Sequence, residues 1–180
     1  LIEADGPAPT RDRQVELARE VGADVAFFLD PRPAIGRGIG EILEPIDLPE
    51  LALVLVLSDR RLSTERVYRA FDEVQPFDNR TVFEYRAGEA EKRWREVEDV
   101  GQIPRLLEKD LENAVYGIVP TLLNDREIVV REGALAALVS GSGPTLYGLC
   151  ASSEKGEELV ERLGVRGYKT RLATVPRGVS

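Results

Sequence analysis

The chain has 180 residues, with 24 Lys and Arg against 32 Asp and Glu, a formal net charge of −8, one Cys and no His. The lack of histidine excludes Ser–His–Asp and Cys–His catalysis and zinc sites with mixed Cys/His ligands. The acidic balance argues against a nucleic acid partner, and the longest clean apolar run, Leu51–Leu57, is far short of the roughly 20 residues of a membrane helix. The single Cys150 forms no intrachain disulfide, which fits a cytoplasmic location.

Apolar spacing, caps and chain breakers predict the elements of the first half of the chain. In order, we expect a helix over Arg11–Val21 capped by Thr10, a short strand or buried turn over Val25–Leu29, a glycine-bearing strand from Ala34 paired with 41–46, a central strand over Leu51–Leu57, and a helix over Ser63–Phe71 capped by Ser63 or Thr64. Residues 1–9 have no periodic pattern and are expected to form a loop.

The second half is expected to alternate helices with short strands. In order, its elements are a helix over Gly88–Val100 with Trp94 as a core anchor, a helix opening at Asp110–Val115, a helix over Thr121–Arg131, strands over Ala134–Val139 and Thr145–Cys150, a helix over Ser153–Leu163 that Gly164 ends, and a strand over Lys169–Val175. This order predicts an α+β fold, an antiparallel sheet with helices on one face. We expect residues 34–180 to form that domain and residues 1–33 to be the end of another.

Two segments offer chemistry. The turn Ser140–Pro144 reads Ser-Gly-Ser-Gly-Pro, and its glycines allow successive backbone N–H groups to point outward at an anion such as phosphate. An ordinary hairpin turn has the same composition. Asp24 stands between a helix end and an apolar run, where a carboxylate can act as a general base or simply cap a turn.

Three further side chains have less specific surroundings. Tyr68 follows the central strand on the next helix and is either a core-edge ring or a surface on which a base stacks. Cys150 ends an apolar strand, and we expect it to be an inert core residue. The alternating glycines of 34–41 fit either sheet curvature or close approach of a ligand, and the residues alone do not separate the two.

Five segments in this order are similar to one family. They are Gly22-Ala-Asp-Val-Ala-Phe-Phe-Leu29, Gly36-Arg-Gly-Ile-Gly-Glu-Ile-Leu-Glu-Pro45, Leu62-Ser-Thr-Glu-Arg-Val-Tyr68, Asp110-Leu-Glu-Asn113 and Val139-Ser-Gly-Ser-Gly-Pro-Thr-Leu-Tyr-Gly148. Together they resemble the 4-diphosphocytidyl-2-C-methyl-D-erythritol kinases of the GHMP kinase superfamily. The resemblance implies a GHMP carboxy-terminal domain with a ferredoxin-like sheet over 34–180, and the remnant of the amino-terminal domain over 1–33.

The resemblance also implies an activity, the ATP-dependent phosphorylation of the 2-hydroxyl of a cytidyl diphosphate sugar alcohol in isoprenoid precursor biosynthesis. It gives Asp24 the role of the catalytic base, which a histidine-free chain can use because phosphoryl transfer needs little more than a base, positioning and charge stabilisation. The implied substrate-binding residues are Thr64, Tyr68 against the cytosine, and Gly141, Ser142 and Gly143 beside the phosphates. Mg²⁺ is implied with ATP, but no ligand set for it is evident, and the oligomeric state is not readable.

The chain departs from the family pattern at two places. Ala26 stands where the family motif has proline, which loosens the loop but leaves Asp24 in place. Nothing before Thr10 resembles the family's early lysine or its Gly-Leu-Gly-Ser-Ser loop. We therefore expect this chain to be the carboxy-terminal two-thirds of such a kinase, binding ATP poorly alone. The alternatives are a GHMP kinase of the homoserine or mevalonate type, and a catalytically silent α+β binding domain.

Overall fold

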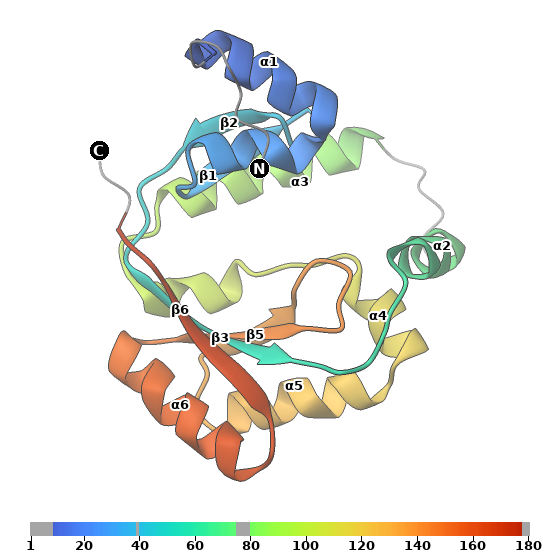
Figure 1. Ribbon diagram of the computed structural model, residues 1–180, viewed down its shortest axis with the longest axis vertical. Helices are drawn as coiled ribbons and strands as arrows, with labels where there is room; N and C mark the ends of the chain where they lie inside the picture. Colours follow the sequence, from blue (N-terminus) through green and yellow to red (C-terminus); the bar gives the residue numbers. More distant parts are fainter. Residues whose placement is uncertain (1–8, 39, 75–79, 178–180) are drawn as a thin grey trace, which may run out of the picture. The chain divides into compact units, whose positions relative to one another are not determined.

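The computed structural model describes residues 9–38, 40–74 and 80–177, which fall into two compact units (Figure 1). The first unit comprises the described residues up to Asp47, and the second runs from Leu48 to Arg177. No helix among the described residues is both long enough and apolar enough to cross a membrane.

The first unit contains a helix, a 3₁₀ helix and a hairpin. Its elements are α1 (Arg11–Val21), η1 (Ala23–Leu29), β1 (Ala34–Arg37) and β2 (Ile42–Pro45). The Thr10 hydroxyl accepts the N–H of Arg13 and caps α1 as predicted. The predicted hairpin is also present, with β1 and β2 antiparallel as a sheet of their own.

One expectation for the first unit differs from the structure. The run Val25–Leu29 is neither a strand nor a buried turn: it belongs to the 3₁₀ helix η1, where the Phe28 side chain is 72% exposed. The compact units divide between Asp47 and Leu48, so β1 and β2, which pair with each other, fall in the first unit, where β2 contacts η1. The assignment of residues 1–33 and 34–180 to two domains stays a prediction. The hairpin therefore forms a two-stranded sheet of its own, and its strands are not part of the four-stranded sheet.

The second unit contains the larger sheet and most of the helices. Its elements are β3 (Leu51–Leu57), α2 (Thr64–Val74), α3 (Arg80–Arg95), η2 (Val100–Arg105), α4 (Glu112–Ile118), α5 (Thr121–Arg131), β4 (Ala136–Val139), β5 (Leu146–Cys150), α6 (Ser153–Val165) and β6 (Lys169–Val175). The helix ends of α5 and the strand ends of β3 and β6 agree with the predicted bounds.

The larger sheet has the strand order β4-β5-β3-β6, with every neighbouring pair antiparallel. Strands β3 and β4, which helices connect, lie on either side of β5. Strands β5 and β6, which α6 connects, lie on either side of β3. Two interleaved strand–helix–strand units of this kind define the ferredoxin-like arrangement, so the predicted α+β fold class is confirmed.

The core of the second unit lies between one face of the sheet and the helices. Alternate residues of β3 are buried, as a strand with one covered face requires. Helices α5 and α6 lie together on one side of the sheet (Figure 1) and contact its strands. The cluster on this face comprises Ala52, Val54, Val56, Leu122, Val129, Leu159, Leu163 and neighbouring buried side chains.

Three local expectations have mixed outcomes. Cys150 is fully buried in this cluster, and burial raises the pKa of its thiol, so the predicted inert core role is confirmed. Trp94 was wrongly expected in the core, since its side chain is only half-buried on α3. Helix α6 continues through Gly164 to Val165, and the glycine with a left-handed φ, +83°, is Gly167.

Candidate functional site

The turn Ser140–Pro144 and the start of α2 meet in the second unit. The Thr64 hydroxyl, at the first residue of α2, lies 2.8 Å from the Ser142 hydroxyl in the middle of the turn. These residues are 78 positions apart in the chain. The structure thus joins two of the predicted substrate-binding residues directly, and it places Gly141 and Gly143 on either side of their contact.

The turn has a conformation that only glycine adopts readily at two positions. Gly141 has φ +58° and Gly143 has φ +77°, both in the left-handed region. Two backbone bonds close the turn: Ser140 N–H donates to Thr145 O at 2.8 Å, and Gly143 N–H donates to Ser140 O at 2.9 Å. The turn is therefore a closed, defined loop with Ser142 at its tip.

The tip of this loop has backbone donors to offer. In the part of the chain that the structure describes, the N–H groups of Gly141 and Ser142 donate no hydrogen bond. Unpaired N–H groups beside a hydroxyl, in a turn with positive φ, suit the oxygens of a phosphate. The loop therefore fits a phosphate-bearing ligand.

Tyr68 lies one helical turn beyond Thr64 on the same helix, α2. Its side chain is 52% exposed, so the ring is not buried, and both interpretations, a core-edge ring and a stacking surface, stay open. An exposed ring in this position is available for stacking against a flat ligand.

The Glu112 carboxylate accepts hydrogen bonds beside the start of the loop. Glu112, the first residue of α4, accepts the N–H of Val139 at 3.0 Å and the hydroxyl of Tyr116 at 2.7 Å, both at Oε1. Burial and then the Glu112 carboxylate raise the pKa of Tyr116, and the same two causes raise the pKa of Tyr147. Burial lowers the pKa of Lys109, and the Glu112 charge opposes that shift. The sequence resemblance covered Glu112 without giving it a role.

Asp24 belongs to the first unit, whereas the other five predicted site residues belong to the second. It lies in the first turn of η1 and is exposed. Two residues later, Ala26 is buried where the family motif has proline. The structure therefore presents the Asp24 carboxylate at the surface of its own unit.

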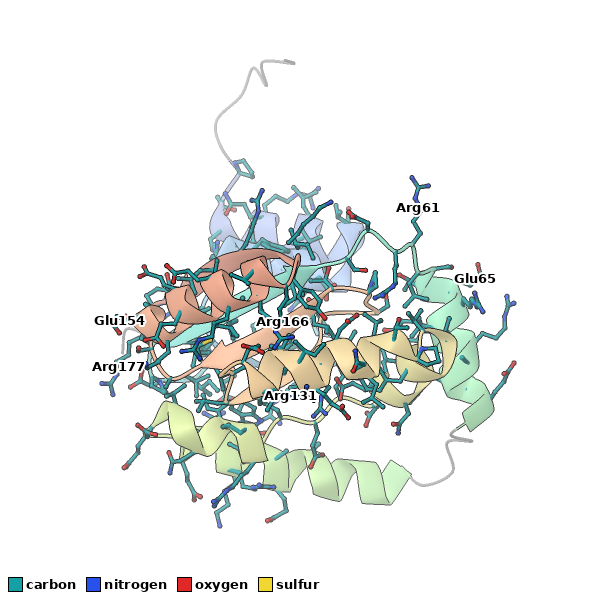
Figure 2. The ribbon with its side chains drawn as sticks, turned by 90° about the horizontal axis from the view of Figure 1, so that it is seen from below. Arg61, Glu65, Arg131, Glu154, Arg166 and Arg177 are labelled. Atoms are coloured by element: carbon teal, nitrogen blue, oxygen red, sulfur yellow. The ribbon has the colours of Figure 1, made fainter. Side chains whose placement is uncertain are left out.

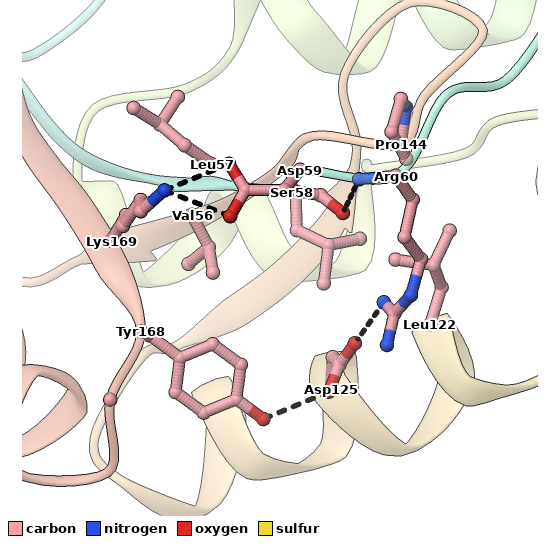
Figure 3. Close-up of a pocket in the computed structure, with 12 residues that line it drawn as sticks. Val56, Leu57, Ser58, Asp59, Arg60, Leu122, Asp125, Pro144, Tyr168 and Lys169 are labelled. Atoms are coloured by element: carbon pink, nitrogen blue, oxygen red, sulfur yellow. Dashed lines mark hydrogen bonds and ion pairs between the residues drawn. The ribbon is translucent and has the colours of Figure 1, made fainter.

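Sequence reasoning missed a pocket of about 420 Å³ in the second unit (Figure 3). Its buried floor includes Val56, Leu122 and Leu146. On its walls Arg60 pairs with Asp125 at 2.9 Å, the Tyr168 hydroxyl donates to Asp125 at 2.8 Å, and Lys169 binds both carboxylate oxygens of Asp59 at 2.8 Å. The polar groups of this pocket therefore satisfy one another. The Arg60–Asp125 pair ties the segment between β3 and α2 to α5.

The raised pKa of Tyr168 makes the free energy of unfolding depend on pH in the alkaline range. Burial and then the bond to Asp125 raise its pKa to about 12, above the ordinary value of about 10. The folded protein thus holds this proton more tightly, so the stabilisation is complete below about pH 10 and is lost as pH rises toward 12. We expect the free energy of unfolding, measured by urea titration, to fall less steeply between pH 10 and 12 in Tyr168→Phe. Equal slopes in both proteins contradict this assignment.

Charges of both signs are interspersed over the second unit. Figure 2 shows Arg61, Glu65, Glu154 and Arg177 at the edges of the ribbon in this view, and Arg131 and Arg166 nearer its middle. Several of the arginines are paired with acids, including Arg166 with Glu132 at 2.6 Å and Arg69 with Glu65 at 2.7 Å. Among the described residues of this unit the arginines are therefore interspersed with acidic side chains and do not form a separate positive patch.

Comparison with known proteins points to one family. Residues 90–169 match the family described as GHMP kinases C terminal. The chain is 36% identical over 160 residues to a 4-diphosphocytidyl-2-C-methyl-D-erythritol kinase of Arthrobacter sp. (strain FB24), covering 88% of the chain and 50% of that protein. A protein of the same name from Geobacter metallireducens is 36% identical over 145 residues, covering 80% of the chain and 48% of the relative. The chain thus spans about half the length of these relatives.

Solved structures agree. A crystal structure of 4-(cytidine 5'-diphospho)-2C-methyl-D-erythritol kinase superposes with a TM-score of 0.67 at 31% identity, covering 97% of the chain and 59% of that structure. The mevalonate kinase of L. major superposes with a TM-score of 0.58 at 20% identity, which shows a shared fold.

Proposed function

We propose that the protein transfers the γ-phosphate of ATP to the 2-hydroxyl of 4-diphosphocytidyl-2-C-methyl-D-erythritol, since residues 90–169 match the family of GHMP kinase carboxy-terminal domains. The relatives named for this activity support the proposal. The observation that carries it is the contact between Thr64 and Ser142, because it joins two segments that the family resemblance assigns to one substrate site.

We assign the chemical roles by what phosphoryl transfer requires. The Asp24 carboxylate takes the proton from the attacking hydroxyl, and the loop amides at Gly141 and Ser142 hold phosphate oxygens. Tyr68 stacks on the cytosine ring, and Thr64 borders the same part of the site. Each role uses a group that the structure leaves exposed or without an internal partner.

Mg²⁺ belongs to this proposal as the companion of ATP. Among residues 9–38, 40–74 and 80–177, no three His, Cys, Asp or Glu side chains are arranged to hold a metal ion.

We also assign residues 1–33 to the end of the GHMP amino-terminal domain. We assign the protein to the cytoplasm.

The proposal is tested by offering ATP and one alcohol at a time to the protein expressed from its whole reading frame. Phosphorus NMR identifies the phosphorylated product, and ADP release gives the rate. We expect transfer to the cytidyl substrate and none to mevalonate or homoserine. Transfer to mevalonate or homoserine supports another GHMP kinase instead. Binding of the cytidyl substrate without transfer to any alcohol supports a silent binding domain.

Replacing Tyr68 with Ala is expected to raise KM for the cytidyl substrate by roughly 5- to 150-fold, because stacking one base contributes about 1–3 kcal/mol. KM for ATP should change much less. Tyr68→Phe is the matched control, since it keeps the ring and should stay near the unmodified protein. Steady-state kinetics with each substrate varied in turn measure both constants, and equal effects on the two substrates argue against stacking.

A further inference from the structure

Glu112 contacts the end of β4 at the point where the loop Ser140–Pro144 leaves the sheet. Val139 is the last residue of β4, and Ser140 follows it directly. Because β4 is an edge strand, its outward N–H groups have no strand partner on that side. The N–H of Val139 donates instead to Glu112 Oε1 at 3.0 Å. A side chain from α4 thus completes the edge of the sheet at the base of the loop.

The partners of Glu112 make this contact a firm one. The Tyr116 hydroxyl donates to the same Oε1 at 2.7 Å. A partly buried carboxylate is costly unless donors satisfy it, and hydrogen bonds to a charged oxygen are roughly twice as strong as neutral ones. Two neutral donors, one on the backbone and one a turn along α4, therefore hold the carboxylate in place. Glu112 in turn holds Val139.

The position of Val139 bears directly on the loop. A Cβ added at Gly143 would lie 3.1 Å from Cγ1 of Val139 and 3.5 Å from Cγ1 of Val115, which is on α4. The loop therefore rests on Val139 and on the helix that carries Glu112. A shift of Val139 displaces the loop and with it the Ser142 hydroxyl that lies 2.8 Å from Thr64.

We propose that Glu112 is a positioning residue for the phosphate-binding loop Ser140–Pro144: its carboxylate fixes the end of β4 and so holds Ser142 against Thr64. This role rests on the proposed function, because the loop matters for turnover only if it binds the substrate's phosphates. Glu112 itself touches no reacting atom and acts through Val139.

The test compares Glu112→Leu, which removes the acceptor at similar size, with Glu112→Gln, which keeps an acceptor oxygen. Since a displacement of about 1 Å can lower a rate about a hundredfold, we expect kcat to fall roughly 10- to 100-fold in Glu112→Leu. Glu112→Gln should recover most of kcat, and KM for ATP should stay within about threefold. Glu127→Leu, the same change at an exposed acid on α5, is the control and should leave kcat unchanged.

A purely structural role predicts a different result: thermal stability falls in Glu112→Leu, but kcat per folded molecule matches that of Glu127→Leu. That result, or failure of Glu112→Gln to recover kcat, overturns the proposal. A second measurement needs no turnover. Backbone amide NMR signals of Gly141–Gly143 should shift in Glu112→Leu, while those of β6 stay in place. Unshifted loop signals overturn the positioning role even if the kinase activity is confirmed. If the protein has no kinase activity but these signals shift, the proposed function fails while the positioning of the loop by Glu112 is still supported.

Discussion

Replacing Asp24 with Asn is expected to lower kcat for phosphoryl transfer by about 10²- to 10⁴-fold, the usual contribution of a positioned general base. Asparagine has nearly the same shape as aspartate but does not accept the proton of the attacking hydroxyl. Asp24 is exposed in the first turn of η1, so the change removes little packing. Initial rates at saturating substrate measure kcat, and nucleotide affinity measured by titration should stay within a factor of about two.

The matched control is Asp30→Asn, at the other end of η1. Asp30 caps that helix and pairs with Arg32, so it shares the element and the charge of Asp24 but has its own partner. We expect this variant to keep its turnover. Unchanged turnover in Asp24→Asn, or an equal loss in Asp30→Asn, contradicts the assignment of Asp24 as the base.

Replacing Gly143 with Ala is expected to destabilise the second unit by about 2–4 kcal/mol, as left-handed strain and close packing add together. The residue has φ +77°, and its new Cβ would lie 3.1 Å from Val139 and 3.4 Å from Leu62. Urea unfolding measures the loss. The same change should displace Ser142 from Thr64 and therefore lower activity in whatever fraction remains folded.

Gly141→Ala separates the two causes of this destabilisation. Gly141 has φ +58°, but nothing lies within 4 Å of a Cβ added there. It therefore carries only the conformational cost, about 1–2 kcal/mol. Equal losses of stability in the two variants would show that close packing beneath the loop contributes nothing, against the contact between Gly143 and Val139.

Local sequence signals predicted the elements of the second unit well where a breaker or cap marks their ends. The predicted bounds of α5 hold because Pro120 precedes it and Gly133 follows it closely. The end of α6 was misplaced because both Gly164 and Gly167 are near it, and only the backbone shows which one takes positive φ. Val25–Leu29 was misread because an apolar run this short has no periodicity that separates strand from helix.

The site was predictable only in part, since its decisive contacts are long-range. The Thr64–Ser142 contact joins residues 78 apart, and the Glu112–Val139 bond joins residues 27 apart. No local pattern indicates either contact. Family resemblance selected Thr64 and Ser142 as members of one site, but it gave no role to Glu112. The pocket at Asp125 was missed because its lining comes from four separate segments of the chain.

We propose that the Thr64–Ser142 contact marks the binding site of a cytidyl diphosphate substrate. The most direct test is a titration of the protein expressed from its whole reading frame, labelled with ¹⁵N, with 4-diphosphocytidyl-2-C-methyl-D-erythritol. We expect the backbone signals of Gly141–Gly143 and Thr64–Tyr68 to shift together with one dissociation constant, while those around Asp125 stay in place. Shifts confined to other residues, or no shifts at saturating substrate, would contradict it.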